Sequence, residues 1–403
     1  MERQKTCDCL RKIKILYMDW NCYGGRDMKQ ALFASGAEIS LYPFNPKTDR
    51  NDPIFEKTFS ASICSFSPRF VFSFNYFPVI SKVCNALEVT YVSWVYDNPL
   101  VSLYSYTLAN PCNRVFLFDR QEYLFFLGNG IPTVHYLPLA AAPGRLKAMP
   151  SCESIARKYA ADISFVGSLY TEPRHRLYQR VKNLPDRTRG YLDAIMQAQK
   201  QVYGASFLED LLTDEVLSDL RKACPCPPNA DGVESESYLY SNYFLLRHVT
   251  ALERMELIRE IGKNHNLQLY TNDASYTCPG CVNHGPADYY NESPYIFRHS
   301  KINLNITLRS IKSGIPLRAF DIIGSQGFLL TNYQEDFADC FTPGQDYVYF
   351  SDQEDLMAKL EYYLCHDKER AEIAQTGYEK ILRYHTYEHR IPVLFGKQTT
   401  QDE

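Results

Sequence analysis

Two doubly wound α/β domains are the architecture that this sequence predicts. The chain has 403 residues, more than one hydrophobic core usually supports, so two domains are expected. Short apolar runs alternate with helix-length segments along most of the chain, which is typical of parallel strands joined by crossover helices. A stretch rich in small residues, Pro and Gly, at 140–150, separates two such series and predicts a linker.

The first series predicts an N-terminal Rossmann-like domain over residues 1–143. Ile13 to Trp20 is a nearly continuous apolar run, as expected for a strand that is buried on both faces. The break at 21–25 leads into a helical segment at 27–34 and a second strand at 37–42, which completes a β-α-β unit. Further strands are expected at 70–74, 90–95, 114–119 and 133–137.

The second series predicts a C-terminal domain over residues 144–385. It begins with a strand at 162–167 and continues into a polar helical insertion at about 172–230. Apolar residues at helical spacing predict a helix at 247–264. Strands are expected at 267–271, 302–306, 328–331 and 347–350, helices at 353–366 and 368–384, and a final segment, 386–403, returning toward the N-terminal domain.

Composition narrows the function classes. The net charge is −4, from 43 basic and 47 acidic side chains, which argues against sequence-independent nucleic-acid binding. The N-terminus lacks the pattern of a signal peptide, and no apolar stretch is long enough to span a membrane. The 13 Cys residues are an odd number and are interpreted as reduced thiols, so a cytoplasmic protein is expected. Peripheral membrane contact is left open.

A basic segment in the second domain is the strongest candidate for ligand binding. Residues 293–320 contain no Asp or Glu but hold Arg298, Lys301, Arg309, Lys312 and Arg318 around a loop with Gly314. Ligands of parallel sheets bind at the carboxyl ends of the strands, and two facing domains imply an interdomain cleft. Cations and backbone N–H groups there suit a diphosphate, although a solvated helix face is the alternative.

A second candidate phosphate loop is Gly167-Ser168, directly after the strand at 162–167, with a tight βα turn as the alternative. The chain has no Gly-x-Gly-x-x-Gly after its first strands and no Walker loop. NAD-dependent dehydrogenases and P-loop NTPases are therefore disfavoured.

Polar residues also end two strands of the first domain. Asp97 follows the strand at 90–95, and Asn75 follows the strand at 70–74. Asp97 is the candidate catalytic carboxylate, as a base or as the orienter of a substrate hydroxyl, with a turn or cap residue as the alternative.

Four cysteines raise the question of a metal. Cys224, Cys226, Cys278 and Cys281 offer four thiols, but only the second pair has the usual zinc spacing. Reduced loop thiols are the leading interpretation, no metal site is predicted, and structural zinc stays an alternative.

Several motifs, taken together, match a known family. Residues 285–331 resemble the nucleotide-sugar-binding half of the bacterial spore-maturation CgeB-like glycosyltransferases, and His385 to Arg390 looks like that family's closing helix motif. The motifs SFNYFP, SWVYDNP, LFDR and YLPLA are similar to the uncharacterised domain often fused ahead of it. The resemblance covers nearly the whole chain.

The resemblance implies a GT-B fold, with the donor nucleotide on the C-terminal domain and the acceptor on the N-terminal one. It implies catalysis without metal or cofactor, because helix dipoles and basic side chains neutralise the leaving diphosphate. Asp321 falls where related enzymes place a Glu that binds the ribose. The expected nucleotide-sugar residues are Gly167, Ser168, Tyr270, Thr271, Asn272, Asp288, Tyr289, Arg309, Lys312, Gly314, Arg318 and Asp321. Two departures are Ser313, where related families carry a second Glu, and Gln326, where Gly is usual.

The resulting hypothesis is a glycosyltransferase that moves a sugar from a nucleotide-diphosphate donor to a protein or cell-surface glycan. A catalytically silent GT-B protein that binds nucleotide or glycan is the main alternative. A sugar-nucleotide epimerase is a further alternative, although it would want additional acid and base groups around the sugar. The sugar, the base, the acceptor and the stereochemistry are not assigned.

Overall fold

The structure is a computed structural model, and it describes residues 10, 12–181 and 183–396. The chain divides into two compact units. Unit 1 comprises the described residues of Met1–Ala142 and Tyr384–Glu403 together with Asn229–Val233, and unit 2 comprises those of Pro143–Pro228 and Glu234–Arg383. No helix among the described residues is long and apolar enough to cross a membrane.

Unit 1 is built on a parallel sheet of six strands in the order β2-β1-β3-β4-β5-β6. Its central strand β3 is buried at every position, as expected for a strand covered on both faces. The strands are β1 (Lys14–Asp19), β2 (Glu38–Pro43), β3 (Phe70–Phe74), β4 (Thr90–Trp94), β5 (Asn113–Leu117) and β6 (Val134–Tyr136).

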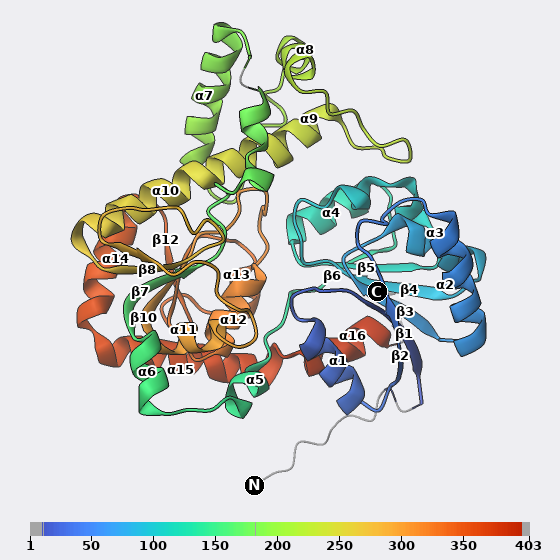
Figure 1. Cartoon of the computed structure of the whole chain (residues 1–403), viewed down its shortest axis with the longest axis horizontal. Helices are drawn as coiled ribbons and strands as arrows, with labels where there is room; N and C mark the ends of the chain where they lie inside the picture. The colour runs from blue at the N-terminus through green and yellow to red at the C-terminus, as the bar shows by residue number, and fades with distance from the viewer. Residues whose placement is uncertain (1–9, 11, 182, 397–403) are drawn as a thin grey trace. The chain divides into compact units, whose positions relative to one another are not determined.

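Helices cover both faces of this sheet (Figure 1). The chain runs from β1 to β2 on one side of β1 and then crosses to β3 on the other side, and right-handed crossovers in opposite directions place their helices on opposite faces. Helices α2 and α3 pack against each other, whereas α1 packs against α16. The helices are α1 (Gly25–Ala34), α2 (Pro53–Phe66), α3 (Pro78–Ala86), α4 (Arg120–Gly128) and α16 (Tyr387–Phe395), with short 3-10 turns η1 (Val101–Tyr104) and η2 (Tyr106–Ala109).

Two segments distant in sequence complete unit 1. In α16, the Tyr387 ring lies 5.8 Å from Trp94 and the Phe395 ring lies 5.5 Å from Phe70. The loop Asn229–Val233 is held by Asp231, whose carboxylate accepts hydrogen bonds from Arg50 at 2.5 Å and from Ser105 at 2.7 Å. This loop was expected in the second domain, at the end of its helical insertion, since no local pattern reveals a partner 181 residues away.

Unit 2 contains the second parallel sheet, also of six strands, in the order β12-β11-β10-β7-β8-β9. The strand order reverses between β7 and β10, the kind of switch point at which α/β proteins bind ligands. The strands are β7 (Ala161–Val166), β8 (Leu267–Tyr270), β9 (Cys281–Asn283), β10 (Ser300–Asn305), β11 (Leu329–Asn332) and β12 (Val348–Phe350).

The helices of unit 2 pack on its sheet in two groups. One core cluster joins α10, α14 and α15 to the sheet, while α11 packs against α12 and α6. Outside the helical insertion, the helices of unit 2 are α5 (Pro143–Ala148), α6 (Glu153–Tyr159), α10 (Leu246–Asn264), α11 (Ser293–His299), α12 (Leu317–Gly324), α13 (Phe337–Cys340), α14 (Gln353–Cys365) and α15 (Asp367–Tyr384).

The helical insertion has a hydrophobic core of its own, which packs on the first turns of α10 (Figure 1). It contains η3 (Pro173–His175), η4 (Leu177–Val181), α7 (Asp186–Lys200), α8 (Asp214–Ala223), α9 (Glu236–Leu239) and the π-helical η5 (Tyr240–Leu245). The prediction of two doubly wound α/β domains is confirmed, and the predicted strands correspond to observed ones.

Candidate functional site

The loop after β7 forms the centre of the candidate site in unit 2. The backbone N–H of Gly167 donates to the carbonyl of Tyr270 at 2.8 Å and so joins the carboxyl ends of β7 and β8. The guanidinium of Arg318 lies against Gly167, because a Cβ atom there would be only 2.7 Å from the Arg318 Cζ. Gly167 also has a φ of 155°. A side chain at this position would therefore displace the arginine.

Helix α12 brings a cation and an anion to this strand end. Arg318 is its second residue and Asp321 lies one turn later, so both face the same side of the helix. The helix N-terminus also presents backbone N–H groups that lack partners within the helix, and these favour an anion. A positive helix end beside a guanidinium and a glycine is an arrangement that suits a phosphate group.

Arg254 of α10 is a buried part of this arrangement that the sequence analysis missed. Its guanidinium donates to the carbonyls of Ser168 and Ile306 and so ties the loops after β7 and β10 together. Burial lowers the pKa of Arg254 to about 10, so the side chain stays charged at neutral pH. A signal did exist, because Arg254 stands at helical spacing with the buried residues Leu257, Ile258 and Ile261.

Three buried polar atoms near these strand ends have no hydrogen-bond partner among the described residues. They are the Thr271 hydroxyl after β8, the Asn305 Oδ1 at the end of β10, and the Glu172 Oε1 in the loop after β7. The other Glu172 oxygen accepts a hydrogen bond from the Ser168 hydroxyl at 2.8 Å. Buried polar atoms are normally paired, so each of these three atoms is suited to a ligand or water that bonds to it.

Asp321 is nearly buried, with a relative exposure of 9%, and lies beside Tyr289. The Tyr289 hydroxyl donates to Asp321 Oδ1 at 3.2 Å. Asp288, in contrast, stabilises its own loop, because its carboxylate accepts hydrogen bonds from the backbone N–H groups of Tyr290 and Asn291 at 3.0 and 2.7 Å. Tyr289 therefore contacts Asp321, whereas Asp288 bonds only to the backbone of its own turn among these contacts.

Arg309 differs from the other predicted phosphate residues, since its donors are already engaged. Its Nε and Nη2 each donate to Glu253 at 2.7 Å, and the two side chains are only 5% and 4% exposed. Further bonds go to the carbonyls of Val202 and Lys200, and the guanidinium lies 3.8 Å from the centre of the Tyr203 ring. The contacts of Arg309 support a structural role and not the predicted phosphate role.

The remaining predicted residues of unit 2 lie around the same carboxyl edge. Lys312 is half-buried and lines, with Asn332 and Gln334, a small surface pocket. Gly314 is buried in the loop before α12, and Asn272 is exposed after β8. The Tyr270 ring stacks on His284 at 4.7 Å, and burial raises the pKa of Tyr270 to about 12.

Two of the five basic residues lie toward the opposite edge of the sheet. Lys301 stands near the amino end of β10 and pairs with Asp162 at 2.7 Å. Arg298 is in the last turn of α11, just before that strand. The acid-free segment is therefore not one continuous basic surface, because a strand runs through its middle.

In unit 1, the predicted residues Asp97 and Asn75 are in direct contact. The Asn75 side-chain amide donates to Asp97 Oδ2 at 2.7 Å, and its oxygen accepts the backbone N–H groups of Tyr96 and Asp97 at 3.1 and 3.3 Å. Asn75 has a φ of 59°, which Asn tolerates better than most residues. Asp97 is an exposed residue, and the Tyr96 pKa is raised by burial and by the Asp97 charge.

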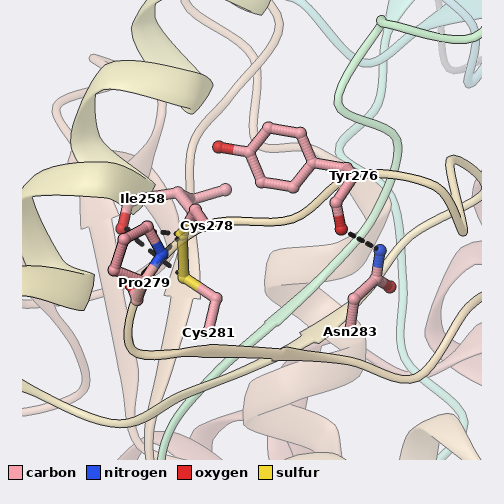
Figure 2. The surroundings of a disulfide bond; sticks show 6 residues. All are labelled: Ile258, Tyr276, Cys278, Pro279, Cys281 and Asn283. Atoms are coloured by element: carbon pink, nitrogen blue, oxygen red, sulfur yellow. Dashed lines mark hydrogen bonds between the residues drawn. A yellow bond between two sulfur atoms is a disulfide. The ribbon is translucent and has the colours of Figure 1, made fainter.

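The cysteine pair Cys278 and Cys281 forms a disulfide (Figure 2). The expectation of reduced thiols is therefore wrong for this pair, and the zinc alternative loses two of its ligands. Cys224 and Cys226 are free thiols. Within the residues that the structure describes, no cluster of three or more His, Cys, Asp or Glu side chains is arranged to hold a metal ion.

Comparison with known proteins gives one family match. A family described as "Glycosyl transferase-like" matches residues 247–395, which contain Arg254, Tyr289, Arg318 and Asp321 but not the Gly167 loop or Asp97. No curated protein matches the chain.

Solved structures with the same fold are distant in sequence. The chain is similar to sucrose-phosphate synthase from Thermosynechococcus elongatus, with 10% identity, a TM-score of 0.53, and coverage of 95% of this chain and 98% of that one. Anabaena HepE in complex with UDP-glucose gives 10% identity, a TM-score of 0.53 and coverage of 94% and 98%. A glycosyltransferase from Rickettsia africae gives 10%, 0.51, and 95% and 97%. The chain therefore has the GT-B fold of glycosyltransferases, and residues 247–395 form a glycosyltransferase-like region of it.

Proposed function

We propose that this protein transfers a sugar from a nucleotide-diphosphate donor to a protein or cell-surface glycan acceptor, as a member of the CgeB-like glycosyltransferases. The observation that carries the proposal is the Arg318 guanidinium held against Gly167 at the carboxyl end of β7. The UDP-glucose bound to HepE, which shares the fold, supports a donor of this class.

The donor is assigned to unit 2. Arg318 and the N-terminus of α12 bind the diphosphate and stabilise the negative charge that develops on it as the sugar leaves. Arg254 keeps the loops after β7 and β10 in place. Asp321 accepts hydrogen bonds from the ribose hydroxyls, and Lys312 and Gly314 lie in the loop that leads into α12. This scheme needs no metal or cofactor.

The acceptor is assigned to the carboxyl edge of the unit 1 sheet. Asp97 is an exposed residue after β4, and the hydrogen bond from Asn75 orients its carboxylate. An acceptor hydroxyl that bonds to Asp97 becomes a better nucleophile as it loses its proton.

Substitution of Arg318 tests the donor site. Each hydrogen bond to a charged group contributes about 1.5–3 kcal/mol, so Arg318→Ala should weaken nucleotide binding about tenfold or more. Isothermal titration of the full chain with UDP, GDP, CDP and dTDP, and with their sugars, measures this loss.

Lys301→Ala is the matched control, because Lys301 belongs to the same basic segment but lies near the amino end of β10. The Lys301→Ala variant should bind nucleotide as tightly as the unmodified chain. Equal affinity in the Arg318 variant would contradict the proposed site, whereas tight nucleotide binding without any sugar transfer would favour a catalytically silent binding protein.

A further inference from the structure

Arg145 of α5 contacts the candidate donor site from outside the region that the glycosyltransferase family matches, which begins at residue 247. The small residues, Pro and Gly of 140–150 predicted a linker, so no function was expected of this arginine. In the structure its side chain is only 15% exposed, although arginine side chains normally extend into water.

Two tyrosines hold the Arg145 guanidinium. It lies 4.7 Å from the ring centre of Tyr289 and 5.0 Å from that of Tyr290, both within the range of a cation–π contact. The two rings meet edge to face at 4.8 Å. Arg145 also donates to the Tyr289 carbonyl at 3.2 Å and to the Tyr289 hydroxyl at 3.4 Å. The arginine thus fixes both the backbone and the ring of Tyr289.

The Tyr289 hydroxyl and the Arg145 guanidinium both approach the same carboxylate oxygen of Asp321. Asp321 Oδ1 accepts a hydrogen bond from the Tyr289 hydroxyl at 3.2 Å, and Arg145 Nη2 lies 3.8 Å from the same atom. The Asp321 side chain is only 10% exposed. A carboxylate so far removed from water needs a nearby positive charge to stay ionised, and Arg145 supplies one.

We propose that Arg145 is a positioning residue of the donor site, which keeps Asp321 ionised and oriented to bind the ribose hydroxyls. The site is thereby selective for ribonucleotides over 2′-deoxyribonucleotides. The inference rests on the proposed function. A carboxylate has about four acceptor positions, so it can hold a ribose diol together with the Tyr289 hydroxyl. A 2′-deoxyribose lacks one of the two donors, which leaves the buried carboxylate poorly paired.

The test compares ribose with deoxyribose. Isothermal titration of the full chain with UDP, GDP, CDP and ADP identifies the nucleotide that binds best, and its 2′-deoxy form is then titrated in parallel. The unmodified chain should prefer the ribose form about tenfold, the loss expected for one hydrogen bond to a charged group. Arg145→Ala should reduce this preference to about threefold or less, and adding Arg145→Ala to Asp321→Ala should change it no further.

Two more variants guard against a simple loss of folding. Tyr289→Phe removes one hydroxyl from the same oxygen and should lower the preference partly. Arg157→Ala is the matched control, since Arg157 is an exposed arginine of α6 paired only with the exposed Glu153 among the contacts described, and the preference should be unchanged.

The outcomes distinguish a failure of the positioning role of Arg145 from a failure of the proposed function. An Arg145→Ala variant that keeps the full ribose preference, or that weakens both forms equally, overturns the positioning role and leaves the nucleotide site standing. An unmodified chain that binds a nucleotide without ribose preference overturns the inference in the same way. An unmodified chain that binds neither these four nucleotides nor dTDP overturns the proposed function and the inference with it, whereas a chain that binds dTDP but none of the four ribonucleotides overturns only the inference.

Discussion

Glu253→Ala should destabilise unit 2 by about 3–5 kcal/mol, the cost of leaving a buried charge without its partner. Glu253 accepts two hydrogen bonds from Arg309, and both side chains are almost fully buried. The Tyr203 hydroxyl donates to the same carboxylate at 2.5 Å. In the variant, the Arg309 charge would keep only backbone carbonyls and the Tyr203 ring as neighbours among these contacts.

Two spectroscopic signals can assign the effect to one unit. The chain has 2 tryptophans, Trp20 and Trp94, and both belong to unit 1, whereas far-UV circular dichroism follows both units. In guanidinium titrations the circular dichroism transition of Glu253→Ala should therefore move to lower denaturant. The tryptophan fluorescence transition should stay in place if the units unfold independently, and should move with it if they unfold together.

An exposed ion pair supplies the control. Glu372 lies 3.9 Å from Lys368 on α15, with side chains that are 67% and 93% exposed. Exposed pairs contribute about 0–1 kcal/mol, so Glu372→Ala should leave both transitions nearly unchanged. Equal stability of the Glu253 and Glu372 variants would contradict a structural role for Arg309 and return it to the phosphate candidates.

The alternation of strands and helices was predictable because parallel strands buried on both faces appear in the sequence as continuous apolar runs. Phe70–Phe74, buried at every position, is the clearest example. The missed strand, Cys281–Asn283, is three residues long and lies at the edge of its sheet, with Val282 50% exposed. It carries no apolar run, so only pairing with Leu267–Tyr270 reveals it.

The contact partners of individual side chains could not be predicted from the sequence. Charge composition marked Arg309 and Arg318 as equivalent, yet one pairs with Glu253, 56 residues away, and the other lies on Gly167. Distances of this kind depend on which helix packs over which strand end. Local residue types predicted a basic loop and a glycine turn, but only the packed structure distinguishes a buried ion pair from a candidate phosphate ligand.

Asp97→Asn should reduce the turnover of the protein about hundredfold or more, because a general base contributes about 10²–10⁴-fold to the rate. The substitution preserves the shape of the side chain but removes the charge that accepts a proton. Asn75 Nδ2 donates to Asp97 at 2.7 Å and can still bond to an amide oxygen, so the loop should keep its conformation. The measurement is sugar transfer at saturating donor, with donor affinity determined separately by titration.

Donor affinity is expected to be unchanged, because the residues assigned to the nucleotide belong to unit 2 and Asp97 belongs to unit 1. Asp19→Asn provides the matched control: Asp19 also ends a strand of the unit 1 sheet, but its carboxylate is paired with Lys29 at 2.8 Å. That variant should lose at most a few-fold in turnover. A similarly small loss for Asp97→Asn would show that Asp97 only orients the acceptor or shapes the turn after β4, and that the proton leaves by another route, such as the donor's own phosphate.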